Sequence, residues 1–538
     1  MMMDYQLTLN TILSRVKNLY PKKEVVSRDF SGTFVYTYAD MYERIKKLGN
    51  VIKELGINKG DKIGTLAWNN HRHLELYFAI PMMGAVLHTL NLRLSTEQLS
   101  YVINHGEDRV IFVDKDVVPL LEAIKDQIQG VEKFVIMSDT KEVPENNLPG
   151  EVYSYEALIE KAYPDVEFPE LDEKTPAAIC YTTATTGNPK GIVYTHRSIV
   201  LHCFSIISPE ALDLHEEDCL MPFVPMFHVN AWGLPYAATW VGANQVYPGH
   251  RPDPETVCKL MDEHKVTIGA GVPTIWMGTY AVWEQGNYDY SHIRGLVCGG
   301  SAAPRHMIKN YKENLGIPII HAYGMTETSP LVLASKPKSY MRDWEDEELI
   351  NIATKQGLLV PGLEMKVVDD EGSEIDWDGE QMGELLLKGP WIAGEYYKEP
   401  EKTQESVKDG WLHTGDIVTV DPEGYVKIVD RSKDLIKSGG EWISSVDLEN
   451  TIMTHPEVKE AAVISIPDEK WIERPMAFVV LNGGAEDKIS EQDIIEFLKP
   501  KVSRIWIPDK VEFIDEIPKT SVGKFNKRNL REKVVDEG

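Results

Sequence analysis

Short apolar runs typical of strands alternate with helical patterns along most of this chain. Residues 63–68 and 109–113 are rich in β-branched and aromatic side chains, whereas residues 73–83 and 117–128 have apolar residues at helical spacing. Parallel strands need crossover connections, so this alternation predicts helices covering the faces of mostly parallel sheets. We therefore expect an α/β protein with a large N-terminal domain of layered sheets and a smaller α+β domain at the C-terminus.

Two charged stretches suggest how the chain is divided. Residues 143–171 are rich in Pro, Glu and Asp, which is typical of a connection across the surface. The run Asp-Arg-Ser-Lys-Asp at 430–434 follows a hairpin-like stretch around Gly424 and precedes enough chain for a compact domain. We expect a large domain at 1–429, a junction at 430–434 and a second domain at 435–538.

The charge of the chain excludes some partners. The 56 basic and 84 acidic side chains give a net charge of −28 with histidine neutral. This sign argues against broad nucleic-acid binding and against docking on anionic lipid through a basic patch. We expect neither nucleic acid nor a membrane surface bound in this way among its partners.

Compartment can be inferred from the cysteines and the N-terminus. Five cysteines, none in a CxxC pair, favour buried thiols in a reducing compartment. Residues 1–17 lack the pattern of a secretory signal, and the apolar stretch 77–87 is interrupted by Pro81 and too short to cross a bilayer. We expect a cytoplasmic protein without a membrane-spanning segment.

The most informative segment is residues 181–191, Tyr-Thr-Thr-Ala-Thr-Thr-Gly-Asn-Pro-Lys-Gly. It follows an apolar strand at 177–180 and precedes a helix expected to start near Thr195 or His196. Hydroxyl groups, glycine N–H groups and one lysine are the components of an anion-binding loop. The loop is not a Walker A motif, because Lys190 precedes Gly191 and no hydroxyl residue follows the lysine.

These residues resemble the signature of the adenylate-forming enzymes, which include acyl-CoA synthetases, luciferases and the adenylation domains of peptide synthetases. The chain departs from that signature at Ala184, where glycine is usual and positive φ is easier. Five further stretches match motifs of the superfamily in its usual order: 299–304, 321–328, 411–416, 430–434 and 518–524. The chain is identified as a member similar to AMP-forming long-chain fatty acyl-CoA synthetases.

The resemblance implies a two-step reaction that uses ATP, Mg²⁺ and CoA. A carboxylic acid attacks the α-phosphorus of ATP to form an acyl-adenylate, and the thiol of CoA then displaces AMP. Catalytic roles are implied for Lys190, His228, Glu327 and Lys524, with Thr182 and Glu327 as ligands of Mg²⁺. Asp430 is the expected hinge about which the C-terminal domain turns between the two steps.

Nucleotide contacts are implied for a larger set. Tyr323 would stack on adenine, and Asp416 would accept both ribose hydroxyls, since a carboxylate can take two hydrogen bonds. The other expected contacts of the nucleotide are Thr182, Thr183, Thr185, Thr186, Gly187, Gly300, Ser301, Ala302, His321, Ala322, Gly324, Thr326, Arg431, Lys433, Lys437, Gly440 and Trp442.

The identity of the acid is open at this stage. Val229, Trp232 and Gly299 are expected to border the acyl pocket, with Trp232 at the position of the gating tryptophan in fatty acyl-CoA synthetases. A medium- to long-chain fatty acid is the leading hypothesis. The alternatives are a ligase for a short-chain, hydroxy or aryl acid, an adenylation module that feeds a carrier protein, and a nucleotide-binding homologue without turnover. Residues 1–30 resemble an arm through which some bacterial relatives form homodimers.

Overall fold

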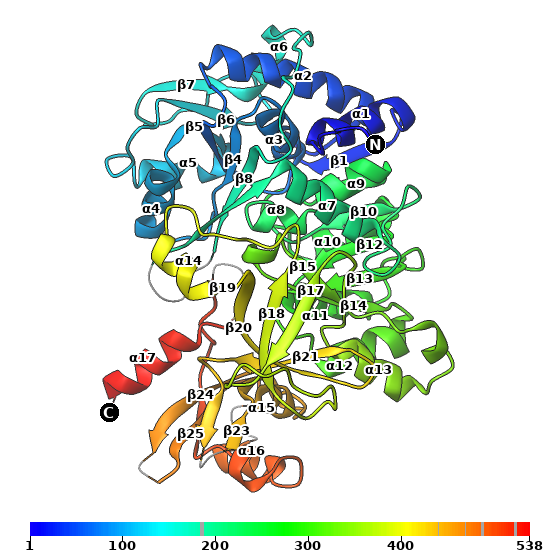
Figure 1. The fold of residues 1–538 in the computed structure, drawn as a ribbon, viewed down its shortest axis with the longest axis vertical. Coiled ribbons are helices and arrows are strands. Elements are labelled where there is room, and N and C mark those ends of the chain that lie inside the picture. The colour runs from blue at the N-terminus through cyan, green and yellow to red at the C-terminus, as the bar shows by residue number, and fades with distance from the viewer. Residues whose placement is uncertain (183–187, 439–440, 469, 486–488, 521–524, 538) are drawn as a thin grey trace.

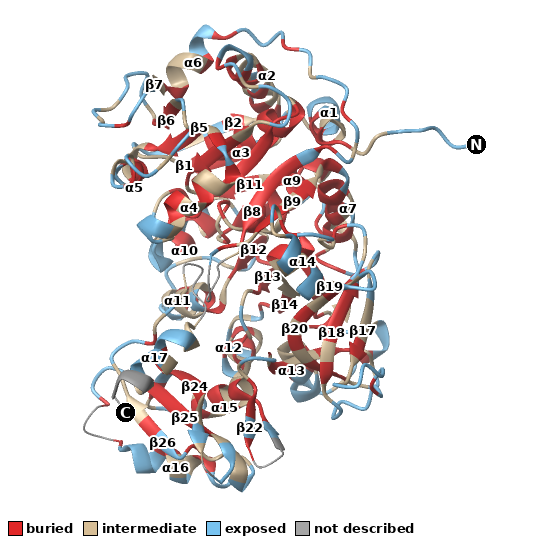
Figure 2. Ribbon diagram, turned by 60° about the vertical axis from the view of Figure 1, so that its left-hand side comes forward, coloured by how far each residue is buried: buried red, intermediate tan, exposed pale blue. Residues whose placement is uncertain are grey.

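The computed structural model describes residues 1–538 except 183–187, 439–440, 469, 486–488, 521–524 and 538. Two large sheets make up the N-terminal part, and two smaller sheets follow them along the chain (Figure 1). The expected α/β architecture is confirmed, because helices lie against sheets whose neighbouring strands are mostly parallel. The buried strands and the more exposed outer helices are seen in Figure 2.

The first large sheet has seven strands, all parallel except the last pair. In spatial order they are β7 (Glu151–Ser154), β6 (Lys133–Met137), β5 (Asp108–Asp114), β3 (Lys62–Leu66), β4 (Val86–Thr89), β8 (Pro176–Tyr181) and β9 (Gly191–Thr195).

The second large sheet has nine strands, with parallel pairing from β14 through β1. In order they are β16 (Leu358–Leu359), β15 (Leu331–Ala334), β14 (Ile319–Gly324), β13 (Gly295–Cys298), β12 (Ile268–Gly271), β10 (Cys219–Pro222), β11 (Asn244–Tyr247), β1 (Glu24–Arg28) and β2 (Thr33–Thr37).

The two smaller sheets each have five strands. The third sheet contains β17 (Glu364–Val368), β18 (Gly383–Lys388), β20 (Trp411–Val420), β19 (Val407–Lys408) and β21 (Val426–Arg431). The C-terminal sheet contains β23 (Glu441–Ile443), β22 (Ile436–Ser438), β25 (Ile472–Leu481), β24 (Val458–Asp468) and β26 (Lys510–Phe513).

Helices of the N-terminal half are α1 (Leu9–Leu19), α2 (Tyr38–Glu54), α3 (His71–Met82), α4 (Thr96–Gly106), α5 (Val118–Glu122), α6 (Tyr155–Lys161), α7 (His196–Ile207), α8 (Val229–Trp232) and α9 (Leu234–Val241). Those that follow are α10 (Pro254–Glu263), α11 (Pro273–Trp283), α12 (Arg305–Asn310), α13 (Asp346–Thr354), α14 (Pro400–Ser406), α15 (Ser445–Ile452), α16 (Glu491–Leu498) and α17 (Lys527–Glu537).

Two expectations about local structure need correction. The helical pattern at 117–128 forms only the short α5, after which bonds such as Gln127 N–H to the Ile124 carbonyl tighten the chain into turns. The stretch 143–171 is not only a surface connection, because it contains α6 and the edge strand β7, which pairs with β6. Pairing with an existing sheet edge outweighs the turn-forming composition there.

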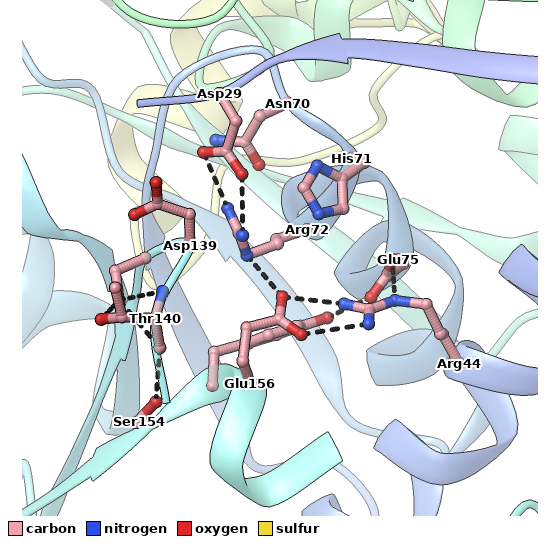
Figure 3. A network of polar contacts seen from close by, with 12 residues as sticks. Asp29, Arg44, Asn70, His71, Arg72, Glu75, Asp139, Thr140, Ser154 and Glu156 are labelled. Carbon is pink, nitrogen blue, oxygen red and sulfur yellow. Dashed lines mark hydrogen bonds and ion pairs between the residues drawn. The ribbon is translucent and has the colours of Figure 1, made fainter. Parts of the chain in front are cut away.

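A partly buried charged network joins the two large sheets (Figure 3). Arg72 on α3 forms a double hydrogen bond with Asp29, which follows β1, at 2.9 and 3.1 Å. Arg72 also donates to Glu156 on α6, and Arg44 on α2 donates to both Glu156 and Glu75. Since these charges are paired, their burial does not leave an isolated ion, whereas removing one partner would.

Asp114, at the end of β5, is a fully buried carboxyl group. Its Oδ2 accepts hydrogen bonds from the Trp68 N–H at 2.8 Å and the Asn70 side-chain amide at 2.9 Å. Burial raises the pKa of Asp114 to about 8, so the group is largely protonated at neutral pH.

Candidate active site

A cavity of about 470 Å³ lies where the third sheet and the C-terminal elements meet the edge of the nine-stranded sheet. Most of the residues expected to bind substrates, to act in catalysis or to form the hinge line it. They are Thr182, His228, Val229, Trp232, Gly299, Gly300, Ser301, Ala302, His321, Ala322, Tyr323, Gly324, Thr326, Glu327, Asp416, Asp430, Arg431 and Lys433. Segments that are more than 200 positions apart in the sequence therefore meet around one space.

The anion-binding loop connects two antiparallel strands. Tyr181 pairs with Gly191 across β8 and β9, and the Thr182 N–H donates to the Lys190 carbonyl at 2.8 Å. Lys190 N–H donates in return to Thr182 Oγ1 at 3.1 Å. Helix α7 begins only after β9, with Thr195 as its N-cap, so the expected start of that helix is confirmed. The described ends of the loop therefore pair with one another, and β9 separates the loop from the N-terminus of α7.

Glu327 lies in a short 3₁₀ turn after β14 and is 7% exposed. Its Oε1 accepts a hydrogen bond from the Tyr396 hydroxyl at 2.8 Å. The Lys190 ammonium lies over the same tyrosine ring, 4.3 Å from the ring centroid. A second cavity of about 350 Å³ adjoins this group and is lined by Lys190, Glu327, Tyr396 and Arg431, among others. Sequence reasoning missed Tyr396, since a tyrosine between a glycine-rich turn and a charged helix has no distinctive pattern.

Asp416 is held in place at the far side of the cavity. Its two carboxylate oxygens accept from the Tyr323 hydroxyl at 2.5 Å and from Arg431 Nε at 2.6 Å. Each oxygen has a second lone pair, so the carboxylate can still accept further hydrogen bonds. Tyr323, Asp416 and Arg431 come from β14, β20 and β21, and the structure brings all three together as expected.

His321 borders the cavity as a neutral imidazole. Burial lowers its pKa to about 4. Its Nδ1 contacts the Thr354 carbonyl at 3.1 Å, and Ala303 N–H donates to Nε2 at 3.4 Å. Both ring nitrogens thus form hydrogen bonds with the backbone, so the imidazole has a fixed orientation in the wall of the cavity.

The apolar end of the cavity is formed by an unusual backbone turn. Val229, Asn230, Ala231 and Trp232 all have positive φ, between 48° and 59°, and Gly233 follows at 71°. A left-handed turn of non-glycine residues is strained, and it is sustained here by close packing, since Asn230 is 2% exposed and Ala231 fully buried. Nothing in the sequence indicated this turn.

Trp232 packs directly on Gly299. A Cβ atom on Gly299 would lie 3.0 Å from the indole ring and 2.8 Å from the Ala322 carbonyl, so only glycine fits at this position with the ring in place. Ile206, Leu212 and Met277 also line the cavity. The cavity therefore has apolar side chains in its lining beside the polar groups described above.

Asp430 connects the third sheet to the C-terminal elements. It is the penultimate residue of β21, and its Oδ2 accepts hydrogen bonds from the N–H (2.8 Å) and the hydroxyl of Ser445 at the start of α15. Lys527 donates to the Ser445 hydroxyl and pairs with Glu449 at 2.7 Å. Burial raises the pKa of Asp430, which the Lys527 charge partly offsets. Ser445 and Lys527 were not expected from the sequence.

The C-terminal segment reaches the cavity on both sides of an undescribed stretch. Lys519 and Phe525 form an isolated antiparallel bridge, and Thr520, Phe525 and Lys527 line the cavity. Lys437 and Trp442 are not brought to it, because they pair across β22 and β23, with the ammonium 4.6 Å from the indole centroid. The predictions for Thr183, Thr185, Thr186, Gly187, Gly440 and Lys524, and for the Ala184 exchange, lie outside the described residues.

A family model described as AMP-binding enzyme matches residues 13–397, and one described as AMP-binding enzyme C-terminal domain matches residues 447–524. The chain belongs to the AMP-binding enzyme family. A long-chain-fatty-acid–CoA ligase of Thermus thermophilus is 47% identical over 99% of this chain and 96% of its own length. A 3-methylmercaptopropionyl-CoA ligase of Ruegeria lacuscaerulensis is 42% identical over 99% of this chain and 98% of its own.

The fold of this AMP-binding enzyme agrees with the comparison of structures. The crystal structure of the anthranilate CoA ligase AuaEII in complex with anthranoyl-AMP superimposes with a TM-score of 0.87 and 27% identity, covering 99% of both chains. The named relatives thus act on acids of different kinds, whereas CoA ligase is common to their names.

Two further properties bear on the predictions. All five cysteines fall within the described residues, and each is buried with a free thiol. Across the described part of the chain, no helix combines the length and the apolar character needed to span a bilayer.

Proposed function

We propose that this protein is an AMP-forming acyl-CoA ligase. It converts a carboxylic acid and ATP into an acyl-adenylate and pyrophosphate, and then transfers the acyl group to the thiol of CoA with release of AMP. The observation that supports it is that Thr182, Glu327 and Asp416 line the same cavity as Trp232 and other apolar side chains. Family membership and full-length relatives named as CoA ligases support the same reaction.

The first step brings an anionic carboxylate to a polyanionic nucleotide, so the protein has to supply positive charge and orientation. Tyr323 offers a ring for adenine, and Asp416 offers carboxylate oxygens for the ribose hydroxyls. Lys190 and Arg431 supply charge near the phosphates, and Lys524 is proposed to act on the reacting carboxylate and α-phosphate. His228 is proposed to contribute at the acyl end, where it borders the cavity.

Thr182 and Glu327 could hold Mg²⁺ only together with the phosphate groups of the nucleotide. The described residues hold no group of three His, Cys, Asp or Glu side chains able to bind a metal by themselves. Thr182 and Glu327 offer a hydroxyl and a carboxylate oxygen on the same cavity, which suits a hard cation that keeps most of its ligands from phosphate and water. When bound, the ion would supply positive charge to the phosphate oxygens.

A medium- to long-chain fatty acid is the proposed substrate. Ile206, Leu212, Met277 and Trp232 give the cavity apolar side chains suited to an alkyl chain. A short-chain, hydroxy or aryl acid is the alternative outcome, as the names of the relatives include both 3-methylmercaptopropionyl-CoA and anthranilate CoA ligases.

We further propose a division into domains at 1–429 and 435–538 with a hinge at 430–434. The separate C-terminal sheet and the contacts of Asp430 with Ser445 support this division. A homodimer and a cytoplasmic location are also proposed. Exposed Met1–Met3 and Tyr5 offer an apolar arm to a second copy, and the free thiols suit a reducing compartment.

The test is release of AMP and pyrophosphate by purified protein with ATP, Mg²⁺ and CoA. Straight-chain acids from about two to eighteen carbons would be compared with benzoate and a hydroxy acid. Highest kcat/KM with medium or long chains supports the proposal, and a maximum with another acid selects the alternative ligase. Absence of AMP formation with every acid, from protein that binds ATP, would leave a nucleotide-binding homologue and contradict the proposed enzyme.

A further inference from the structure

Tyr396 lies between the two charged groups that the proposed function assigns to the triphosphate. Its hydroxyl donates to Glu327 Oε1 at 2.8 Å, and its ring face receives the Lys190 ammonium at 4.3 Å from the centroid. All three side chains line the same 350 Å³ cavity. One side chain therefore contacts both the carboxylate expected to hold Mg²⁺ and the lysine of the anion-binding loop.

The backbone around Tyr396 is attached to the segments that bear those two charges. Ala393 N–H donates to the Glu327 carbonyl at 2.7 Å, and Tyr397 N–H donates to the carbonyl of Gly191, the residue after Lys190, at 2.8 Å. The Tyr396 N–H donates a hydrogen bond to Thr403 Oγ1 on α14 at 2.9 Å. Because both flanks are fixed, the tyrosine has a defined position relative to Glu327 and Lys190, and it is only 7% exposed.

The chemistry of the ring matters because Lys190 and Glu327 attract one another. A direct ion pair in this partly buried cavity would neutralise both groups and would have to be broken before phosphate or metal could bind. In the part of the chain that the structure describes, the Lys190 ammonium contacts a neutral aromatic face. A cation–π contact is weaker than such a pair and is readily exchanged for phosphate oxygens.

The hydroxyl has a second effect, on the carboxylate. The phenol O–H of Tyr396 donates its hydrogen bond to Glu327 Oε1 at 2.8 Å. A bond to one oxygen of Glu327 limits rotation of the carboxylate and fixes the direction of the other oxygen. Groups that orient metal ligands in this way commonly change metal affinity when they are removed.

We propose that Tyr396 is a positioning residue for the proposed reaction: it keeps Lys190 and Glu327 apart and holds each ready, one for phosphate and the other for Mg²⁺. This inference rests on the proposed function for the identity of the ligands. The hydroxyl acts on Mg²⁺ binding through Glu327, and the ring acts on phosphate binding through Lys190, so the two effects can be separated by mutation.

Three variants separate the effects. Tyr396→Phe removes the hydroxyl and retains the ring, whereas Tyr396→Leu removes both. Tyr340→Phe is the matched control, because Tyr340 is exposed and its hydroxyl also bonds a glutamate, Glu423, on the protein surface. Lys190→Met is combined with each Tyr396 variant to measure whether the two positions are coupled.

The measurements are calorimetric titrations with ATP, with and without Mg²⁺, and ATP–pyrophosphate exchange over a range of Mg²⁺ concentrations. Tyr396→Phe should raise the half-saturating Mg²⁺ concentration about tenfold and leave binding of metal-free ATP unchanged. Tyr396→Leu should in addition weaken metal-free ATP binding by about tenfold, or ~1.4 kcal/mol. Lys190→Met should weaken that binding less in the Leu background than in the native protein.

Native behaviour of both Tyr396 variants in binding and Mg²⁺ dependence would overturn the inference, as would equal shifts in Tyr340→Phe. If Tyr396→Leu fails to fold, as judged by circular dichroism, the Mg²⁺ dependence of Tyr396→Phe decides alone. If the native protein binds ATP with Mg²⁺ but shows no exchange with any acid, the proposed function fails. The titrations would still decide the role of Tyr396.

Discussion

Substitution of Ser445 by alanine should affect the two half-reactions differently. The Ser445 hydroxyl donates to Asp430, the expected hinge residue, and accepts from Lys527 of the C-terminal segment. In this arrangement Thr520 and Phe525, which flank the stretch containing Lys524, face the cavity. The contact of Ser445 with Asp430 therefore stabilises the arrangement that suits adenylation, and it has to break if the C-terminal domain turns about Asp430.

The expected size of the effect follows from the groups involved. Of the two hydrogen bonds lost, only the one to Asp430 reaches the hinge, and a hydrogen bond with a charged partner contributes about 1.5–3 kcal/mol. The Ser445 N–H still donates to Asp430 at 2.8 Å, so this amount is the upper limit of the effect. This corresponds to a roughly tenfold to hundredfold shift in the ratio of the two domain arrangements.

Two assays measure the half-reactions separately. ATP–pyrophosphate exchange reports adenylation, and formation of thioester from a supplied acyl-adenylate and CoA reports the second step. Ser445→Ala should slow exchange by up to the shift given above and leave thioester formation unchanged or faster. Ser490→Ala is the control, because Ser490 caps α16 in the same domain without contacting the hinge.

An equal loss in both assays would refute the reasoning, since it would indicate general destabilisation of the domain. The same asymmetry in Ser490→Ala would refute it as well, because loss of an unrelated helix cap would then suffice. Thermal melting of both variants shows whether their folds are comparable.

Three further predictions concern the acyl end, the C-terminal lysine and a buried carboxyl group. Trp232→Ala removes the ring that packs on Gly299 and should reduce discrimination between chain lengths by about 1–3 kcal/mol. The assay is the profile of kcat/KM over acids of increasing length, which should become flatter. An unchanged profile would exclude a gating role. Lys524→Ala should lower the rate of exchange by about 10²–10³, and near-native exchange would contradict its catalytic assignment. Asp114 keeps its proton in the folded state up to pH about 8 but loses it near pH 4 in the unfolded state. The free energy of unfolding therefore falls as pH rises between these two values, by at most ~1.4 kcal/mol per pH unit. Asp114→Asn lacks this loss, so its melting temperature should rise relative to the native protein between pH 5 and 8, and a constant difference would contradict the raised pKa.

Much of the nucleotide end could be predicted from sequence because its chemistry is local. Thr182 lies in a short run whose residue types indicate anion binding, and Glu327 and Asp416 lie in short runs that match motifs of the superfamily. Thr182 follows β8, Glu327 follows β14 and Asp416 lies within β20, so the three come from three different sheets. The structure brings these three residues to one cavity, as the resemblance implied.

The rest depends on contacts between distant segments, which a single sequence does not reveal. Tyr396 is defined by what it touches, since Glu327 and Lys190 lie far from it in the chain. Ser445 and Lys527 likewise gain their significance only from Asp430. The edge strand β7 forms because an open sheet edge was available, in spite of a composition that favours turns.

The left-handed turn at Val229–Trp232 has a consequence for how substrate preference could change. Holding four non-glycine residues in this conformation costs about 1–2 kcal/mol each, so the turn is among the segments most ready to rearrange when its packing is disturbed. The wall against which an acyl chain would rest is thus made of strained backbone. Substitutions that relax this strain could change which acid is accepted, without changing the residues proposed to bind ATP.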